Sequence, residues 1–390
     1  MRSLSFVCLA LLVSCSSSFK PSNASDSQAP AADGSLSADA GSPLNDAASA
    51  PAADGNLTDV GWLASDATSS DRCPAPNADA GTPCSSNPCS VETVLTGLAA
   101  PIDVVLDALN AYVTVFGTGV FEAVSIANAS SARSYVAYSA TYLAIDSSGV
   151  YFLAYQTNEI DRVPLGGGAA LPFAQAQFEP ARLAVKDAYV YWTTDGAYGD
   201  AGTANVGAVM RQPVGSIIPQ TLASGLADPT GIAIDANYVY WTNRGTIASN
   251  YQDGAIWRVA KDGSGNAVEM AAGQLRPEEI AVDANSVYWT NFDGGTVVQL
   301  PLSGGATPTV LASTPGSGPM GIAVDARFVY WVQNLGGAVK AVPIGGGPVT
   351  TIASGLTSPR SIATNDTWIY WVVQGSTTSA SGSLMRTSKL

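Results

Sequence analysis

The chain has 390 residues, of which only 12% are charged, and its formal net charge is −14. Nucleic acids are bound by clustered lysine and arginine side chains, and the 17 such residues here form no cluster, which argues against nucleic-acid binding and against docking on anionic lipid. The absence of histidine excludes Ser-His-Asp and Cys-His catalysis and histidine-ligated metal sites.

The first residues have the pattern of an export signal. Arg2 supplies a positive charge, an apolar run extends from Leu4 to Val13, and a small residue follows at Ser14. The run is about ten residues long, and a helix that spans a bilayer needs roughly 20. We therefore expect residues 1–14 to be a cleaved signal peptide.

The end of this signal resembles the lipobox of bacterial lipoproteins, with the residues Leu12-Val13-Ser14-Cys15. In that family the cysteine is lipid-modified and becomes the new N-terminus, which the resemblance implies for Cys15. The family's sorting rule, applied to Ser16, implies the outer membrane. The alternative is an ordinary cleaved signal that contains a cysteine. We expect an outer-membrane lipoprotein of the cell envelope that contacts the membrane through its lipid anchor only.

Two segments separate the signal from the folded part. Residues 15–72 comprise the cysteine and a stretch rich in Ser, Ala and Asp, which has too little apolar surface to fold and is predicted to be a disordered tether. Residues 73–90 are a lead-in with Cys73, Cys84 and Cys89. An oxidising compartment favours one disulfide, and all three pairings stay open. Three cysteines without histidine make a poor zinc site.

Residues 91–390 contain an internal repeat of about forty residues. The clearest copies begin at Pro229 (PTGIAIDANYVYWTN), Pro277 and Pro319. A turn residue marks the end of the first strand of each copy: Asp107, Asp146, Lys186, Asp235, Asp283, Asp325 and Asn365. A tyrosine follows each marker at the same spacing: Tyr112, Tyr151, Tyr191, Tyr240, Tyr288, Tyr330 and Tyr370.

Each copy predicts four short strands. The first is apolar, as in residues 231–235, and ends in a turn rich in Asp and Asn. The second is the aromatic and β-branched Val-Tyr-Trp run. The third, as in residues 254–259, ends at a glycine-rich turn, and the fourth resembles residues 349–356. Nearly continuous apolar strands indicate burial on both faces, and no segment has a sustained helical period.

The two ends of the repeat region complement each other. Residues 91–98 match the fourth strand at 349–356, and the chain ends with a third strand at 382–389. The N-terminal strand is therefore expected to complete the last blade and leave no free sheet edge in the ring. The fold class is all-β, a seven-bladed β-propeller with four-stranded antiparallel blades closed by the N-terminal strand.

The repeat resembles the YWTD and NHL types of propeller repeat, in a Val-Tyr-Trp-Thr-Asn form that extends through residues 91–389. Asn243, Asn291 and Gln333 stand where the YWTD family carries Asp, so receptor-type ligand binding is not transferred from that family. The antibiotic lyases with seven-bladed propellers also resemble this chain in outline, but they depend on a histidine that this sequence lacks.

Residues that recur in every copy are explained by the ring, so the marker Asp, the Tyr-Trp pair and the glycine-rich turns are interpreted as structural. Functional residues are expected where the copies differ. In a propeller, the segments before the first strands and the loops between the second and third strands lie on one face around the channel mouth. We expect a ligand-binding funnel on this face, formed by Asp103, Arg182, Asp195, Tyr198, Arg244, Tyr251, Glu278, Glu279 and Arg360.

The favoured function is a monomeric binding or scaffold module that takes a protein, peptide or glycan partner at this funnel, with no catalytic residues and no cofactor. A second hypothesis rests on a resemblance to the propeller lactonases, which are hydrolases with calcium held by carboxylate and Asn ligands. The sequence is also consistent with a purely architectural surface role, or with loops that are simply solvated. The candidate calcium ligands are Asp103, Asn243, Glu278 and Glu279, or in a separate site Asp195 and Asp200.

Overall fold

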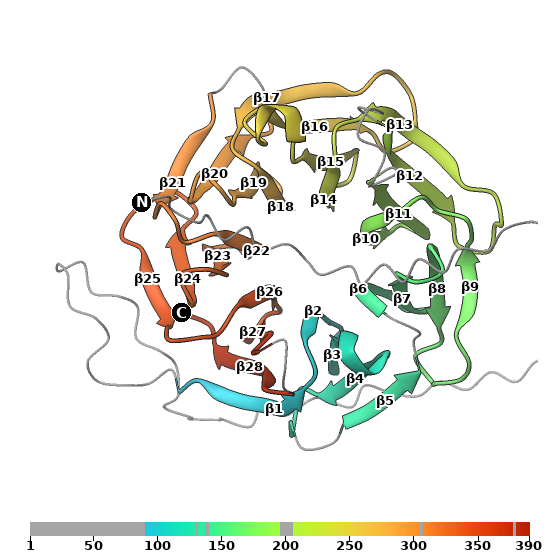
Figure 1. Cartoon of the computed structure of the whole chain (residues 1–390), viewed down its shortest axis with the longest axis vertical. Helices are drawn as coiled ribbons and strands as arrows, with labels where there is room; N and C mark the ends of the chain where they lie inside the picture. Colours follow the sequence, from blue (N-terminus) through green and yellow to red (C-terminus); the bar gives the residue numbers. More distant parts are fainter. Residues whose placement is uncertain (1–89, 130–131, 137–139, 196–205, 304–306, 377–379) are drawn as a thin grey trace, which may run out of the picture. The chain divides into compact units, whose positions relative to one another are not determined.

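The computed structural model describes residues 90–129, 132–136, 140–195, 206–303, 307–376 and 380–390. These residues form seven four-stranded antiparallel sheets, which are arranged as blades around a central axis (Figure 1). This confirms the predicted fold class. In the part of the chain that is described, no helix is long and apolar enough to cross a membrane.

The blades are numbered in chain order. Blade 1 consists of β2 (Pro101–Leu106), β3 (Asn110–Val115), β4 (Val120–Ser125) and β5 (Ala132–Val136). Blade 2 consists of β6 (Ala140–Asp146), β7 (Gly149–Ala154), β8 (Glu159–Val163) and β9 (Leu171–Ala174). Blade 3 consists of β10 (Pro180–Lys186), β11 (Tyr189–Thr194), β12 (Gly207–Pro213) and β13 (Gln220–Leu226). Blade 4 consists of β14 (Pro229–Ile234), β15 (Tyr238–Asn243), β16 (Gly254–Ala260) and β17 (Val268–Gln274). Blade 5 consists of β18 (Pro277–Val282), β19 (Ser286–Asn291), β20 (Thr296–Pro301) and β21 (Thr309–Ser313). Blade 6 consists of β22 (Pro319–Val324), β23 (Phe328–Gln333), β24 (Ala338–Pro343) and β25 (Thr350–Ala353). Blade 7 consists of β26 (Pro359–Thr364), β27 (Trp368–Val373), β28 (Gly382–Ser388) and β1 (Glu92–Leu98).

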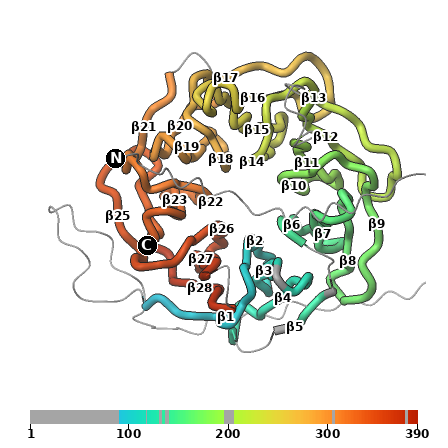
Figure 2. Tube along the Cα trace, in the orientation of Figure 1, coloured from blue at the N-terminus to red at the C-terminus, as the bar shows by residue number. Residues whose placement is uncertain are grey.

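Blade 7 is closed by the first strand of the chain, as predicted. β1 pairs with β28 in antiparallel register, from Glu92 opposite Arg386 to Leu98 opposite Gly382. In Figure 2 the blue N-terminal strand lies beside the red C-terminal strands. The innermost strands β2, β6, β10, β14, β18, β22 and β26 each contact the innermost strands of both neighbouring blades, so the ring is continuous.

Two one-turn 3-10 helices are present where no helix was expected. They are η1 (Phe116–Thr118) and η2 (Ile247–Ser249), and both lie in loops between a second and a third strand. In η2 the side chain of Thr246 accepts a hydrogen bond from the backbone N–H of Ser249. Such a turn is satisfied by local contacts alone and leaves no periodic apolar pattern in the sequence.

The aromatic residues of the second strands form the packing between blades. Trp241 is fully buried, and it packs with Tyr191 and Val209 of the preceding blade. The repeated tyrosines of all seven blades, and the tryptophans that follow them in blades 3 to 7, are at most 2% exposed. The interpretation of the Tyr-Trp pair as structural is therefore confirmed.

The marker Asp closes the turn between the first and second strands. Asp235 Oδ1 accepts hydrogen bonds from the backbone N–H groups of Asn237 (2.6 Å) and Tyr238 (2.7 Å), and Oδ2 accepts one from the Tyr240 hydroxyl (2.7 Å). Burial, together with this carboxylate, raises the pKa of Tyr240. The same three bonds recur at Asp107, Asp283 and Asp325. This explains why the Asp and the Tyr keep a constant spacing.

A break in register near the start of each first strand turns side chains toward the axis. In blade 5, Pro277 pairs with Asn291, and the next regular pair is Ile280 with Trp289. A threonine hydroxyl of the second strand spans the break, because Thr290 Oγ1 accepts from the N–H of residue 279 (3.3 Å) and donates to the carbonyl of residue 320 in the next blade (2.7 Å). These bonds link neighbouring blades and hold the residues after the proline beside the channel.

Candidate functional site

The third residue of the innermost strands faces the axis. Six of the seven equivalent residues line a cavity of about 140 Å³ on the axis: Asp103, Tyr142, Arg182, Glu279, Gly321 and Ser361. The structure therefore brings together three of the residues predicted for the funnel, namely Asp103, Arg182 and Glu279. The cavity is smaller than the roughly 300–1,000 Å³ of sites for drug-sized ligands.

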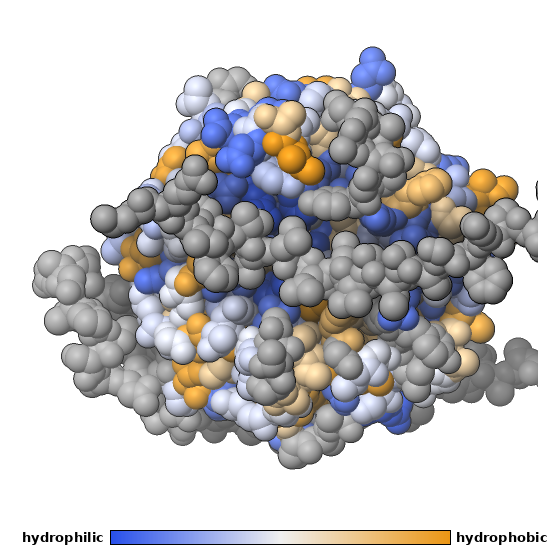
Figure 3. Space-filling model, in the orientation of Figure 1, coloured by the Kyte–Doolittle hydropathy of each residue, from blue (hydrophilic) through white to orange (hydrophobic). Residues whose placement is uncertain are grey.

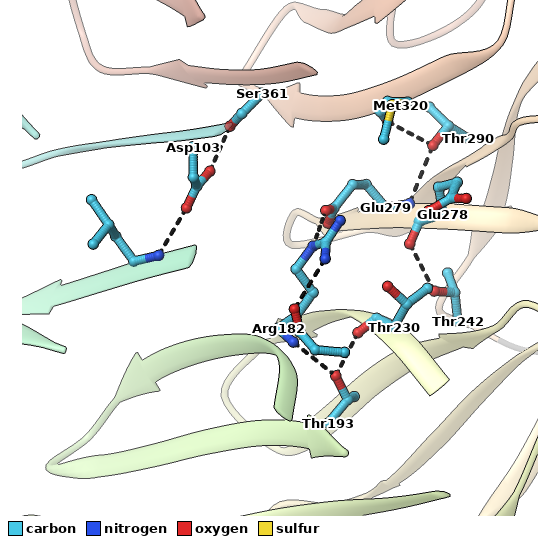
Figure 4. A network of polar contacts seen from close by, with 12 residues as sticks. Asp103, Arg182, Thr193, Thr230, Thr242, Glu278, Glu279, Thr290, Met320 and Ser361 are labelled. Atoms are coloured by element: carbon cyan, nitrogen blue, oxygen red, sulfur yellow. Dashed lines mark hydrogen bonds and ion pairs between the residues drawn. The ribbon is translucent and has the colours of Figure 1, made fainter. Parts of the chain in front are cut away.

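An ion pair crosses this channel. Arg182 Nε donates to Glu279 Oε1 (Figure 4), although the two residues belong to blades 3 and 5. Gly231 occupies the equivalent position of blade 4, where an added Cβ would lie 2.6 Å from the carbonyl oxygen of Glu278. Burial would lower the pKa of Arg182, but Glu279 outweighs it and holds that pKa above its usual value. The guanidinium also lies 3.5 Å from the centroid of the Tyr142 ring.

Asp103 lies on another side of the same cavity. Its Oδ1 accepts a hydrogen bond from the Ser361 hydroxyl (2.6 Å), and its Oδ2 accepts one from the backbone N–H of Leu143 (2.9 Å). Burial raises the pKa of Asp103 to about 6, although both hydrogen bonds oppose the shift. The protonation state of this carboxyl therefore changes near neutral pH.

A second charged cluster surrounds Glu278, whose side chain is 2% exposed. Glu278 contacts Arg244 Nη2 at 2.7 Å and Arg276 Nε at 3.2 Å. Burial alone would raise the pKa of Glu278, but the two arginines outweigh it and hold the pKa below its usual value. The Arg276 guanidinium also lies over the rings of Tyr251 (5.3 Å) and Phe292 (4.8 Å).

The rim of the mouth is built from one backbone contact that recurs from blade to blade. The residue before the proline has a positive φ, as in Glu179 (45°) and Asp228 (50°), and its carbonyl accepts the N–H of the residue after the second strand. The N–H of Asp195 thus donates to Glu179 (3.0 Å), and that of Arg244 donates to Asp228 (2.9 Å). Equivalent pairs occur at Arg276 with Phe292, Gly318 with Asn334, and Ser358 with Gln374.

Sequence reasoning missed part of this rim. It considered the positions after the proline and the long loops, so it found Asp195, Arg244 and Glu278 but not Asp228 or Arg276. The residue before the proline also differs between copies, and this signal could have identified both. Of the other predicted residues, Tyr251 lies beside Arg276, and Tyr198 falls outside the described residues, as does Asp200.

Charge is concentrated on one part of the rim. We use the name acidic arc for the carboxylates contributed by blades 3 to 5, which are Glu179, Asp195, Asp228, Glu278 and Asp293. Burial and the neighbouring carboxylate of Asp228 both raise the pKa of Asp195 to about 9, so Asp195 is protonated at neutral pH. Hydrophilic side chains also gather around the middle of the face shown in Figure 3.

The remaining blades present a different rim. The equivalent pairs of blades 6 and 7 are uncharged, namely Gly318 with Asn334 and Ser358 with Gln374. Arg360 lies beside the second pair, where its Nη1 is 3.4 Å from Gln374 Oε1. Within the described ranges it forms no ion pair, and its buried Nε has no hydrogen-bond partner. The structure therefore does not join Arg360 to the other charged residues of the mouth.

The calcium ligands proposed near the axis do not form a ligand set. Asn243 Oδ1 accepts from the indole N–H of Trp241 (3.0 Å), Glu278 is held between two arginines, and Glu279 is paired with Arg182. Among the described residues, no group of three or more Asp, Glu or Cys side chains is arranged to hold a metal ion. The described donors near the axis therefore do not fit calcium, and the site predicted at Asp195 and Asp200 is not tested because Asp200 lies outside the described residues.

No protein-family model matches this chain, and no curated protein matches it. Several solved structures have a similar fold. Selenomethionine-substituted virginiamycin B lyase from Staphylococcus aureus is 13% identical with a TM-score of 0.62, and the match covers 77% of this chain and 100% of that chain. A streptogramin B lyase is 12% identical with a TM-score of 0.61, covering 77% and 98%. The computationally designed protein Ika8 is 13% identical with a TM-score of 0.53, covering 75% and 98%. Identities this low show a shared propeller fold and nothing finer.

Proposed function

We propose that this protein is a binding module of the cell envelope, and that its acidic arc holds a cationic segment of a protein or peptide partner. The observation that carries the proposal is the charge of the rim. Five carboxylates lie on three consecutive blades. Among the described residues, two arginines form ion pairs with members of this group, namely Arg244 and Arg276. Even with Asp195 protonated, four charged carboxylates face two arginines, so the arc stays negative.

The long-range field has the same sign, because the whole chain carries a formal net charge of −14. Complementary charge increases the rate of encounter and sets the orientation of a partner. Exposed aromatic rings border the arc, with Phe178 74% exposed and Tyr155 41% exposed. Such rings supply apolar contact area and attract cations through their faces.

Arg360 gives the opposite part of the mouth a different preference. Its guanidinium has five N–H donors, and within the described residues it forms no ion pair. A carboxylate or carbonyl of the bound partner would satisfy it. The partner segment is therefore expected to carry lysine or arginine over blades 3 to 5 and an acceptor near blade 7.

The N-terminal segment completes the proposal. A lipid on Cys15, followed by the tether at residues 16–72, would keep the propeller near the membrane without fixing its orientation. Residues 1–89 lie outside the described residues, so this part rests on the sequence alone. Labelling of the expressed protein with a palmitate analogue, compared with Cys15→Ala, tests the anchor.

Calorimetric titration with hexa-arginine and hexa-glutamate peptides tests the arc. Hexa-arginine is expected to bind the full-length protein, with an affinity that falls as salt is raised, and hexa-glutamate is not. The double variant Glu179→Gln/Asp293→Asn should weaken hexa-arginine binding about tenfold. The control Asp262→Asn/Asp366→Asn makes the same charge change in turns at the opposite end of the blades. Equal weakening by both double variants would show attraction to net charge only and would contradict the proposal.

A further inference from the structure

A second concave site lies on the outer wall, between blades 3 and 4. It is a groove of about 480 Å³, within the size range of small-ligand sites. One wall is formed by Leu222 to Leu226 of the outermost strand of blade 3 and by Ala227 after it. The other wall contains Trp257 of β16 and Glu269 of β17. These outer strands are separated from the axis by the two inner strands of each blade.

Two of the groove residues break the repeat. Across blade 4, directly paired residues form the row Ile232, Trp241, Trp257 and Glu269. The first two have apolar equivalents in every blade. The third position elsewhere holds Glu122, Asp161, Met210, Val298, Lys340 and Met385. The fourth position elsewhere holds Ser134, Pro172, Thr221, Val310, Thr351 and Thr93. A tryptophan followed by a carboxylate occurs in blade 4 alone, so the ring does not require it.

The contacts of Trp257 fix its ring in place. The indole stacks on Trp241, with the ring centroids 6.4 Å apart and the planes 15° from parallel. On its other side across the sheet stands Glu269, which is exposed. The buried Nε1 of Trp257 has no acceptor among the described residues. A rigid aromatic surface next to an exposed carboxylate is therefore available at the groove.

The polar lining restricts the ligand. It contains the carboxylates of Asp253 and Glu269 and the amides of Asn243 and Asn266, and none of the described residues that line the groove is a lysine or arginine. The carboxylates disfavour an anionic ligand. A lysine or arginine side chain has donors but no acceptor, so it would leave the amide donor of Asn266 unused. A sugar ring offers an apolar C–H face for the indole, together with hydroxyl groups that both donate and accept.

We propose that this groove is a binding site for a neutral oligosaccharide, with one sugar ring stacked on Trp257 and its hydroxyls donating to Glu269. The acidic arc contributes none of the groove residues, although Ala227 and Asn243 at one end of the groove precede Asp228 and Arg244 of the mouth in the chain. Its occupant would place the outer wall of blades 3 and 4 against a glycan.

Calorimetric titration of the full-length protein with maltohexaose, cellohexaose and chitohexaose tests the site. At least one of the three is expected to bind. Trp257→Val, which installs the residue that blade 5 carries at Val298, should weaken that binding about tenfold. Glu269→Thr, which follows Thr351 of blade 6, should weaken it several-fold. Lys340→Met changes the same row of blade 6 and should leave the affinity unchanged, and melting curves verify the fold of each variant.

Three results would overturn the proposal. The first is that none of the three oligosaccharides binds the wild-type protein. The second is that binding is equal in the wild type and Trp257→Val. The third is that hexa-lysine binds in place of the sugars and is lost in Glu269→Thr, which would show a cation site. The variant Glu179→Gln/Asp293→Asn should not alter sugar binding, so failure of the mouth and failure of the groove are distinguished.

Discussion

Arg182 and Glu279 form an ion pair across the central channel, although a whole blade lies between the two strands that carry them. The pair exists because Gly231 of the intervening blade presents no side chain to the channel. The ring positions all seven residues of this layer in the same way, and the sequence then decides which of them interact. The channel is therefore a specific polar arrangement on a repeated frame.

A side chain at Gly231 should destabilise the propeller. The Cβ of Gly231→Ala would meet the Glu278 carbonyl at 2.6 Å and the Glu279 Cα at 2.9 Å, and both are backbone atoms of the next blade. Overpacking of this kind costs about 2 kcal/mol, measurable by urea unfolding. Gly345→Ala is the matched control, since nothing lies within 4 Å of an added Cβ there. Equal stability of the two variants would show that the blades can separate at no cost.

Removing the charge of Glu278 should lower the free energy of unfolding more than removing an exposed charge does. Glu278→Gln keeps the shape but leaves Arg244 and Arg276 without their buried counter-charge, which costs about 3 kcal/mol in the free energy of unfolding at pH 7. The exposed Glu269→Gln is the control. Because the pKa of Glu278 is held below its ordinary value, the stabilisation is present above that value and is lost as the pH falls through the lowered pKa. The difference between wild type and Glu278→Gln should therefore shrink at low pH.

The contribution of Asp103 to the stability of the fold should depend on pH in the opposite direction from that of Glu278. Its pKa is raised from 3.8 to about 6 in the folded protein, so its contribution to stability is full below 3.8 and is lost as the pH rises through 6. The wild type should lose about 2 kcal/mol from this group between pH 4 and pH 7. Asp103→Asn removes the titration, so its stability relative to wild type should rise over that interval. Parallel stability curves for the two proteins would contradict the buried placement of this carboxyl.

The repeated turn should depend on its Asp. Asp235→Ala removes the acceptor of two backbone N–H groups and of the Tyr240 hydroxyl, which should lower the free energy of unfolding by about 2 kcal/mol. Asp366→Ala changes an exposed Asp in the equivalent turn of blade 7 and should have little effect. If thermal melting showed the same midpoint for both variants, the structural role of the marker Asp would be wrong.

The fold was predictable because its determinants repeat. The spacing of Asp235 and Tyr240 reflects a hydrogen bond within one turn, and local contacts of this kind leave the same trace in each copy. The strand that closes blade 7 was predictable for the same reason, since a missing fourth strand at one end matched an extra strand at the other. The one-turn helices η1 and η2 follow from local loop contacts without a periodic pattern, and they were not predicted.

The site was predictable only in part, because its contacts join residues that differ from copy to copy, and the repeat does not indicate which of them interact. The pairing of Arg182 with Glu279 depends on the register break that turns both toward the axis and on the glycine between them. Arg276 was missed because it precedes the proline, outside the positions where variation between copies was expected. Trp257 was missed because its departure from the repeat lies within a strand rather than in a loop.

The central claim is that a partner with lysine or arginine side chains binds at the mouth. Site-specific photo-cross-linking in cells tests it most directly, with benzoylphenylalanine in place of Phe178 at the mouth or in place of Ile217 in a turn at the opposite end of blade 3. Both residues are highly exposed, at 74% and 89%. We predict an envelope protein cross-linked from position 178 only, through a peptide that contains lysine or arginine. Cross-links from position 217 alone, or equal cross-links from both positions, would contradict the assignment of the mouth.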